Sequence, residues 1–171
     1  PQQADILLIE STYGDRLHPD HPKEQLANAI QKAAAKNGTI IIPTFAVERN
    51  QLLMYYLWKL KSENRIPDLP VYMDSPMATH VLEIFVKNTA WHKLSIAESI
   101  QMCKEIKLVS KPEETDKLAC SSAPKIILAA SGMATGGRVL TYFEHFLGRR
   151  ESTILLVGHQ GEGTRGRALL D

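Results

Sequence analysis

The sequence predicts an α/β fold, a three-layer α/β/α sandwich with a mostly parallel, Rossmann-like sheet. Short apolar runs of strand length, such as residues 40–42 and 126–128, alternate with longer stretches of helical periodicity. The apolar runs are continuous rather than alternating, which is typical of parallel strands covered by helices on both faces. Four of these runs end in small, hydroxyl-bearing or acidic residues, as expected where a strand leaves the core of the sheet.

Each element follows from its own pattern. Strands are expected at residues 6–9, 40–42, 71–73, 106–109, 126–128 and 153–157, the last of them a buried strand. Helices are expected at residues 23–36, 48–62, 77–87, 113–120 and 137–147, where apolar residues recur at helical spacing. Asn37 and Gly38 supply a stop for the first helix, and Pro112 suits the first turn of the fourth. Residues 88–99 are the least regular stretch and predict a loop or a short helix.

The composition is that of one ordinary globular domain of 171 residues, with 44% hydrophobic and 23% charged residues. A net charge of +1 gives no overall field that would attract nucleic acid, so only a local basic cluster could do so. No apolar run approaches the ~18 residues of a membrane span, and no signal-peptide pattern is present. Cys103 and Cys120 are expected to be reduced thiols in a cytoplasmic protein. The two ends read as those of a segment of a longer protein.

The strand ends place several polar side chains along one rim. Ligands of open parallel sheets bind just outside the carboxyl ends of the strands. Glu10, Thr44, Asp74 and Ser131 each stand at or just after such an end. Glu10 is either an ordinary rim residue or a catalytic or ligand-orienting carboxylate. Asp74 could instead cap the helix that starts near Pro76, because aspartate and serine favour that position.

Two glycine-containing turns raise the question of a phosphate site. Ser131 and Gly132 lie in the first, whose spacing matches neither the GxGxxG nor the GxxxxGK[ST] pattern, so it is either a phosphate loop or a tight turn. The second precedes Arg165 and Arg167, which could bind a polyanion or lie on a solvated helix face. The histidines form no HxH, HxxxH or HxxEH pattern, so no metal ligands are predicted.

Five segments together resemble one family: IESTYG at 9–14, PTFAVER at 43–49, DSPMA at 74–78, ASGM at 130–133 and GEGTRGR at 161–167. In this order and spacing they resemble the β-CASP region of metallo-β-lactamase-fold nucleases. That group includes ribonuclease J and the endonuclease subunit of the cleavage and polyadenylation specificity factor. The Gly-Arg-Ala stretch at 166–168 indicates a bacterial or archaeal relative, since Ala168 stands where the eukaryotic members have a histidine.

The resemblance implies an RNA-clamping cap. In the family a separate metallo-β-lactamase domain holds two zinc ions through an HxHxDH run, which is absent here. The resemblance therefore implies residues 1–14 as a strand of that body, residues 15–160 as the β-CASP domain and residues 161–171 as the return into the body. The chain alone should be inactive and bind no cofactor, whereas the full-length enzyme should carry two zinc ions.

The resemblance also assigns roles. Glu10 matches the acidic residue of the first family motif and is expected to be catalytic, and Asp74 is expected to be a cap or an interdomain contact. Expected nucleic-acid contacts or cleft residues are Ser131, Gly132, Arg165, Arg167, Thr44, Phe45 and Arg49. The expected partners are single-stranded RNA, with DNA as an alternative, the metallo-β-lactamase domain of the same chain and a second copy in a homodimer, with no membrane. Two rival hypotheses stay open: a free-standing nucleotide- or small-ligand-binding α/β module, and a cap that serves only protein assembly.

Overall fold

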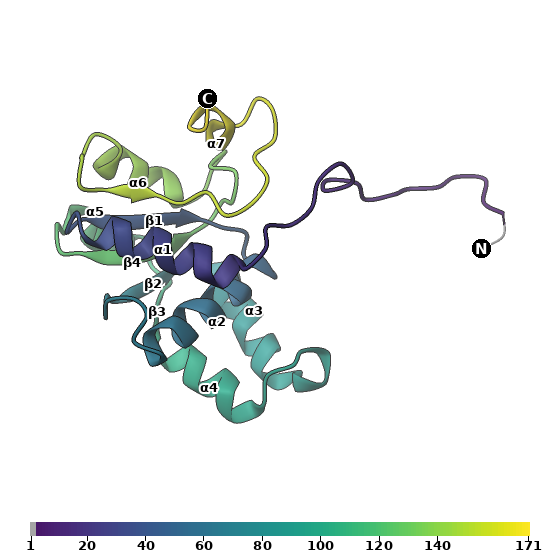
Figure 1. The fold of residues 1–171 in the computed structure, drawn as a ribbon, viewed down its shortest axis with the longest axis horizontal. Helices are drawn as coiled ribbons and strands as arrows, with labels where there is room; N and C mark the ends of the chain where they lie inside the picture. The colour runs from purple at the N-terminus through teal and green to yellow at the C-terminus, as the bar shows by residue number, and fades with distance from the viewer. Residues whose placement is uncertain (1–2) are drawn as a thin grey trace.

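A computed structural model describes residues 3–171. Within this range the five strands are β1 (Thr39–Pro43), β2 (Val71–Asp74), β3 (Ile106–Val109), β4 (Lys125–Ala129) and β5 (Thr153–Ile154). They form one parallel sheet in the order β3-β2-β4-β1-β5 (Figure 1). Ile126 at the centre pairs in register with Ile40 on one side and Val71 on the other. The predicted parallel sheet is confirmed.

Helices cover both faces of this sheet. Its first face carries α1 (Pro22–Ala34), α2 (Arg49–Ser62), α3 (Pro76–Lys87) and α4 (Ile96–Lys104), whose apolar side chains pack on Ile40 and Ile42. Its second face carries α5 (Pro112–Cys120) and α6 (Val139–Phe146), which pack on Ile41 and Ile127. Because successive strand residues point to opposite faces, the single apolar run of β1 feeds both cores. The three-layer sandwich is therefore confirmed.

The connections reverse direction once. From β1 through β2 to β3 the chain moves toward one edge of the sheet and crosses over by helices of the first face. From β3 through β4 to β5 it returns, and it crosses by α5 and α6 on the second face. The neighbours β1 and β4 consequently send their following loops to opposite faces. Such a switch point leaves a crevice between the two loops at the carboxyl ends of the strands, where open α/β sheets bind ligands.

Two strand predictions need correction. Residues 6–9, predicted as a buried strand, form no strand, and their side chains are 69 to 93% exposed. Figure 1 shows the segment before α1 running away from the sheet, so it has no neighbouring strand in residues 3–171 to complete its hydrogen bonds. The last strand is shorter and less buried than predicted, because β5 is an edge strand that pairs only with β1. The predicted division at residues 14 and 160 stays a prediction.

The irregular stretch at residues 88–99 contains a short 3₁₀ helix, Thr89–Trp91, and then the start of α4. Most of α4 was not predicted. Its signal is Ser95 followed by Glu98: the Ser95 hydroxyl accepts from the Glu98 N–H at 3.2 Å, and the Glu98 carboxylate accepts from the Ser95 N–H at 3.0 Å. This reciprocal pair is a capping box, which marks a helix start even where periodicity is weak.

Candidate functional site

A cavity of about 400 Å³ lies at the switch point between β1 and β4. The loop after β1 lines it with Thr44, Phe45 and Arg49, and the loop after β4 lines it with Gly132 and Met133. Glu10, Tyr13 and His159 also line the cavity. Five of the sequence-predicted site or cleft residues therefore share this crevice: Glu10, Thr44, Phe45, Arg49 and Gly132. Their roles stay predictions.

The two loops of the crevice touch directly. The Thr44 N–H donates to the Ala129 carbonyl oxygen at 2.9 Å, which extends the pairing of β1 and β4 by one step. The ring of Phe45, 47% exposed, lies against Gly132. A Cβ at position 132 would stand 2.7 Å from two carbons of that ring, so only glycine fits beneath it.

Backbone strain occurs in both crevice loops. Glu48 has a φ of 65° and Ala134 a φ of 54°, the left-handed region that non-glycine residues seldom adopt. Each such residue costs on the order of 1–3 kcal/mol and persists only where surrounding contacts hold it. For Ala134 such contacts exist: its side chain is fully buried, and its carbonyl accepts a hydrogen bond from Arg165. The loop after β4 is thus held in a defined conformation.

The turn at residues 131–137 is closed by its own hydrogen bonds. The Ser131 hydroxyl accepts from the Thr135 N–H at 3.2 Å, and the Ser131 carbonyl accepts from the Ala134 N–H at 3.1 Å. Within residues 3–171, the N–H groups of Met133, Gly136 and Gly137 donate to no protein atom. Successive free N–H groups in a turn form a concave site for anions. The glycine turn therefore has the donors that a phosphate would need.

The segment at residues 160–166 packs on this turn. The Gln160 side-chain amide donates to the Gly132 carbonyl at 3.1 Å, and the Gly166 N–H donates to the Met133 carbonyl at 3.0 Å. Arg165 Nη1 donates to the Ala134 carbonyl at 3.0 Å. A guanidinium group has five N–H donors, so this contact leaves Arg165 able to bind an anion beside the turn. The structure thus brings Arg165 against the turn that contains Ser131 and Gly132.

Arg167 and Glu10 are arranged differently. Arg167, in the short helix α7 (Arg165–Ala168), forms an exposed ion pair with Asp171 one turn later, Nε to Oδ1 at 3.1 Å, and does not line the crevice. Glu10 is exposed and accepts a hydrogen bond from the Thr12 N–H at 2.7 Å. Hydrogen bonding to Thr12 holds the pKa of the Glu10 carboxyl below its usual value, so the side chain is ionised at neutral pH.

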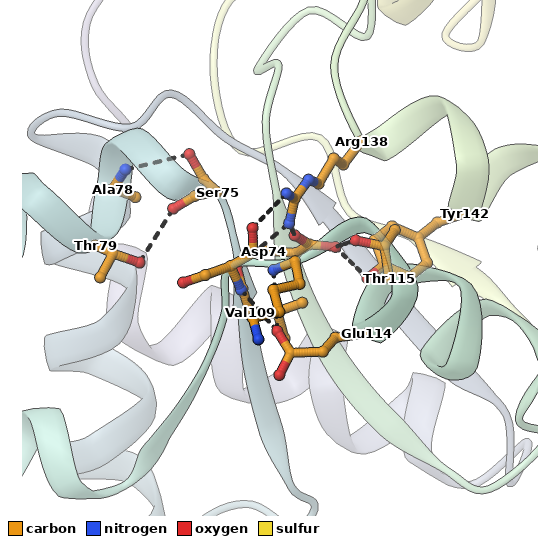
Figure 2. Close-up of polar contacts among 11 residues, drawn as sticks. Asp74, Ser75, Ala78, Thr79, Val109, Glu114, Thr115, Arg138 and Tyr142 are labelled. Atoms are coloured by element: carbon orange, nitrogen blue, oxygen red, sulfur yellow. Dashed lines mark hydrogen bonds and ion pairs between the residues drawn. The ribbon is translucent and has the colours of Figure 1, made fainter.

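Beside the crevice lies a buried carboxylate, Asp74, the last residue of β2 (Figure 2). Its side chain has no exposed surface. Oδ2 accepts from Thr115 Oγ1 of α5 at 2.7 Å and from the Tyr142 hydroxyl of α6 at 2.5 Å. Oδ1 accepts from Arg138 Nη1, which completes a buried ion pair. Burial, followed by the bond to Asp74, raises the pKa of Tyr142 far above its ordinary value, so Tyr142 stays a donor.

Asp74 is not the cap of α3. Ser75 occupies that position, and its hydroxyl accepts from the Ala78 N–H at 3.2 Å. The capping interpretation of Asp74 is therefore wrong. Its carboxylate points instead toward the second face of the sheet, where Thr115, Arg138 and Tyr142 meet it (Figure 2).

Comparison with known proteins decides the family. The model of the Beta-Casp domain matches residues 50–169, which include β2, β4 and the turn that follows β4. The chain belongs to the Beta-Casp domain family. The resemblance predicted from the five sequence segments is confirmed.

Curated relatives of this Beta-Casp chain are bacterial and archaeal. Ribonuclease TTHA0252 of Thermus thermophilus is 32% identical over 178 residues, which cover 99% of this chain and 41% of the relative. The RNase J-like protein of Methanocaldococcus jannaschii is 30% identical, with 98% of this chain and 40% of the relative covered. The transcription termination factor FttA of Methanosarcina mazei is 29% identical, with 98% and 28% covered. The chain thus spans about two fifths or less of these relatives.

Within residues 3–171, no group of three or more His, Cys, Asp or Glu side chains is arranged to hold a metal ion. The zinc pair that the family implies does not fit these residues. In the same part of the chain, no helix is long and apolar enough to cross a membrane.

Sequence reasoning missed three residues of the site. Thr115 lies on α5, whereas Arg138 is the N-cap of α6 and Tyr142 lies within it, and nothing in their local pattern shows that they meet at Asp74. A partial signal exists for Arg138, because it directly follows the two glycines that end a strand-to-helix turn. Thr115 and Tyr142 look like ordinary helix residues in the sequence, and only the order of the strands brings them together.

Proposed function

We propose that this Beta-Casp chain is the RNA-clamping part of a longer ribonuclease that processes or degrades RNA. One observation carries the proposal: Arg165 lies on the turn at residues 131–137, whose N–H groups of Met133, Gly136 and Gly137 are free. Free N–H groups and a guanidinium side by side match the chemistry of a phosphodiester. The names of the bacterial and archaeal relatives, ribonuclease and RNase J-like protein, support the choice of RNA.

The clamp would bind the backbone of a single strand without reading its sequence. Phosphate contacts fix the register and orientation of a nucleic acid, whereas base contacts specify sequence. Ser131, Gly132 and Arg165 would contact one phosphate, and Arg167 would contact another phosphate farther along the RNA. Thr44 and Arg49 would line the path through the crevice. Phe45 offers a half-exposed aromatic ring in the same cavity, suited to contact with an unpaired base.

Cleavage would require another part of the full-length protein. Residues 3–171 assemble no metal site, so the two zinc ions that the family resemblance implies would be held outside them. Glu10, ionised and at the rim of the crevice, would be the residue of this chain nearest to that chemistry. The exposed apolar residues 6–9 support packing of a further domain against this end of the chain.

The first face of the sheet also carries an apolar groove that a further domain could cover. A groove of about 890 Å³ runs between α1, α2 and the segment after β5, and Leu17, Leu52 and Leu170 line it with exposed side chains. Exposed apolar surface of this kind marks a contact with another part of a protein or with a partner. We assign it to the metallo-β-lactamase domain of the same chain, in a cytoplasmic enzyme.

The test is cleavage by the full-length protein. Purified protein should cut a labelled single-stranded oligoribonucleotide, and a chelator should abolish cleavage but leave binding to the RNA measurable. The rival small-ligand module predicts tight binding of a free mononucleotide and none of the oligonucleotide. Oligonucleotide binding that one equivalent of mononucleotide removes would contradict the clamp. An HxHxDH run upstream in the full-length gene is the simplest supporting observation.

A further inference from the structure

The turn at residues 131–137 is anchored at three places. Its start continues β4, whose last residue Ala129 accepts the Thr44 N–H. Its middle is held by the segment at residues 160–166, through the carbonyls of Gly132, Met133 and Ala134. Its end is Arg138, the residue that immediately follows the free N–H groups of Gly136 and Gly137. The Ser131 N–H holds the Gly136 carbonyl at 3.3 Å on one side of these two N–H groups, and on the other side their direction depends on what holds Arg138.

Arg138 is held by a fork of two short contacts, with a third, longer one from Nη1 to the Val109 carbonyl at 3.5 Å. Nη1 donates to Asp74 Oδ1 at the end of β2, and Nη2 donates to the Ser110 carbonyl at 2.6 Å, in the connection between β3 and α5. The planar guanidinium makes both contacts in a fixed geometry, which a lysine ammonium cannot reproduce. One side chain thereby ties the end of the turn to two neighbouring strand ends.

Asp74 is itself fixed from the opposite side. Its second oxygen, Oδ2, receives the hydroxyl groups of Thr115 and Tyr142, so neither carboxylate oxygen is free to turn away from Arg138. A fully buried carboxylate needs such partners, because an unpaired buried charge is strongly unfavourable. Figure 2 shows the side chains of Thr115, Arg138 and Tyr142 converging on Asp74, the first from α5 and the other two from the N-cap and the body of α6. The arrangement is rigid because each group constrains the next.

The charge of Arg138 is already compensated. Its guanidinium pairs with Asp74, and its side chain is 20% exposed. A cation that is paired inside the protein releases no counterion when RNA binds, so it should not contribute to the salt dependence of binding. This separates Arg138 from Arg165, whose guanidinium forms no ion pair with a carboxylate of residues 3–171.

We propose that Asp74 and Arg138 are positioning residues that hold the free N–H groups of the glycine turn in the geometry that binds an RNA phosphate. The inference rests on the proposed function, because it assigns these residues to the same phosphate-binding turn. Neither residue touches RNA. Thr115 and Tyr142 act one step further away, by fixing the carboxylate of Asp74.

The experiment measures binding of a labelled single-stranded oligoribonucleotide to the full-length protein at several salt concentrations. Asp74→Asn and Arg138→Met should each weaken binding about tenfold at every salt concentration, the order of a lost charge-assisted contact. The slope of log affinity against log salt should stay that of the wild type. Tyr142→Phe, which keeps the ring and removes one donor to Asp74, should act in the same direction with a smaller loss.

Two controls make the result specific. Arg150→Met removes an exposed charge in the connection that leads into the amino end of β5, so it should change neither affinity nor slope. Arg138→Lys restores the charge without the fork and should bind as weakly as Arg138→Met. If Asp74→Asn fails to fold, Tyr142→Phe and Thr115→Val carry the test, because each leaves the ion pair intact.

Three outcomes would overturn the inference. Wild-type affinity in Arg138→Met, with a lowered melting temperature, would make the pair purely structural. A slope reduced by ~0.7, or rescue by Arg138→Lys, would mean that Arg138 contacts phosphate directly. Wild-type affinity in the double variant Tyr142→Phe, Thr115→Val would show that the orientation of the Asp74 carboxylate does not depend on these two hydroxyl groups. Failure of the wild type to bind RNA is a different result, since it removes the proposed function itself.

Discussion

The ring of Phe45 lies on Gly132, so the loop after β1 and the loop after β4 meet without a side chain between them. A methyl group on residue 132 would stand 2.7 Å from ring carbons Cδ2 and Cε2. Since Phe45 is 47% exposed, its ring can swing outward into the crevice rather than force the backbone apart. The contact therefore sets the shape of the cavity more than the stability of the fold.

Gly132→Ala should weaken RNA binding by the full-length protein while changing the free energy of unfolding by less than about 1 kcal/mol. The displaced Phe45 ring would occupy the crevice that Thr44, Arg49 and Met133 line. RNA titration and chemical denaturation measure the two effects. Gly161→Ala is the matched control, because its Cβ would meet only ordinary contacts at 3.7 and 3.8 Å. A strongly lowered free energy of unfolding for Gly132→Ala, with unchanged RNA binding, would contradict the assignment of Gly132 to the binding crevice.

Gly137→Ala should behave in the opposite way and destabilise the fold. Gly137 has a φ of +74°, and a Cβ there would stand 2.5 Å from the Ala130 carbonyl oxygen, a backbone atom that cannot move aside. A non-glycine residue in this conformation costs on the order of 1–3 kcal/mol, to which the clash adds. Gly136→Ala, where a Cβ would meet nothing within 4 Å, should stay within about 0.5 kcal/mol of the wild type. Urea denaturation of both variants checks the difference, and equal stabilities would contradict it.

Much of the fold could be predicted because its signals are local. The run at residues 40–42 is apolar throughout, and the structure buries it on both faces of the sheet. The carboxyl-end rim followed from the same reasoning, since parallel strands end at one edge. Residues 6–9 carry an equally apolar run, yet no strand in residues 3–171 lies beside them. Hydrophobicity predicts that a segment is buried, whereas a strand also needs a neighbouring strand that pairs with its backbone N–H and C=O groups.

The site was predicted only in part for a related reason. Thr44 and Ser131 could be placed along one rim because each follows a strand of the same parallel sheet. The convergence on Asp74 could not be predicted, because Thr115 lies 41 positions and Tyr142 lies 68 positions from Asp74 along the chain. Their meeting depends on β2 and β4 being neighbours, which the sequence alone leaves open. Local capping chemistry therefore gave Asp74 a role that Ser75 performs.

Lys125→Met should reveal a pH-dependent contribution to stability. Burial, and then the charge of Arg149, lowers the pKa of Lys125 to about 8, against about 10.4 in an unfolded chain. Between these values the unfolded chain binds more protons than the folded protein, so folding becomes more favourable as pH rises. The stability of the wild type relative to Lys125→Met should therefore increase from about pH 8 to about pH 10 and be flat below pH 7.

The control for this titration is Lys117→Met, an exposed lysine of α5, whose stability difference from the wild type should not change over the same range. Denaturant unfolding at each pH gives the free energies. A constant difference between the wild type and Lys125→Met would mean that the carbonyls of Ser121 and Ala123, which accept from Lys125 Nζ at 2.6 and 2.8 Å, fully compensate for its burial.

Glu10→Gln should impair RNA cleavage by the full-length protein much more than folding. The side chain is exposed, and its contact with the Thr12 N–H needs only an acceptor, which the glutamine oxygen also provides. Loss of a carboxylate that acts near the reacting phosphate should lower the single-turnover rate by ~10²-fold or more. Glu162→Gln, another exposed acid beside the second glycine turn, is the control. A wild-type cleavage rate for Glu10→Gln would make Glu10 an ordinary rim residue.

Arg165→Ala together with Arg167→Ala should weaken RNA binding by the full-length protein and flatten its salt dependence. Each arginine that contacts a phosphate of a single strand contributes a slope of ~0.7 in log affinity against log salt. Arg165 lies on the glycine turn, whereas Arg167 must first leave its ion pair with Asp171. We therefore expect the single variant Arg165→Ala to account for at least half of the change. Lys104→Ala, at the end of α4 that leads into the amino end of β3, is a charge-matched control away from the crevice. An unchanged slope in the double variant, measured by RNA titration at several salt concentrations, would place both arginines on a solvated helix face.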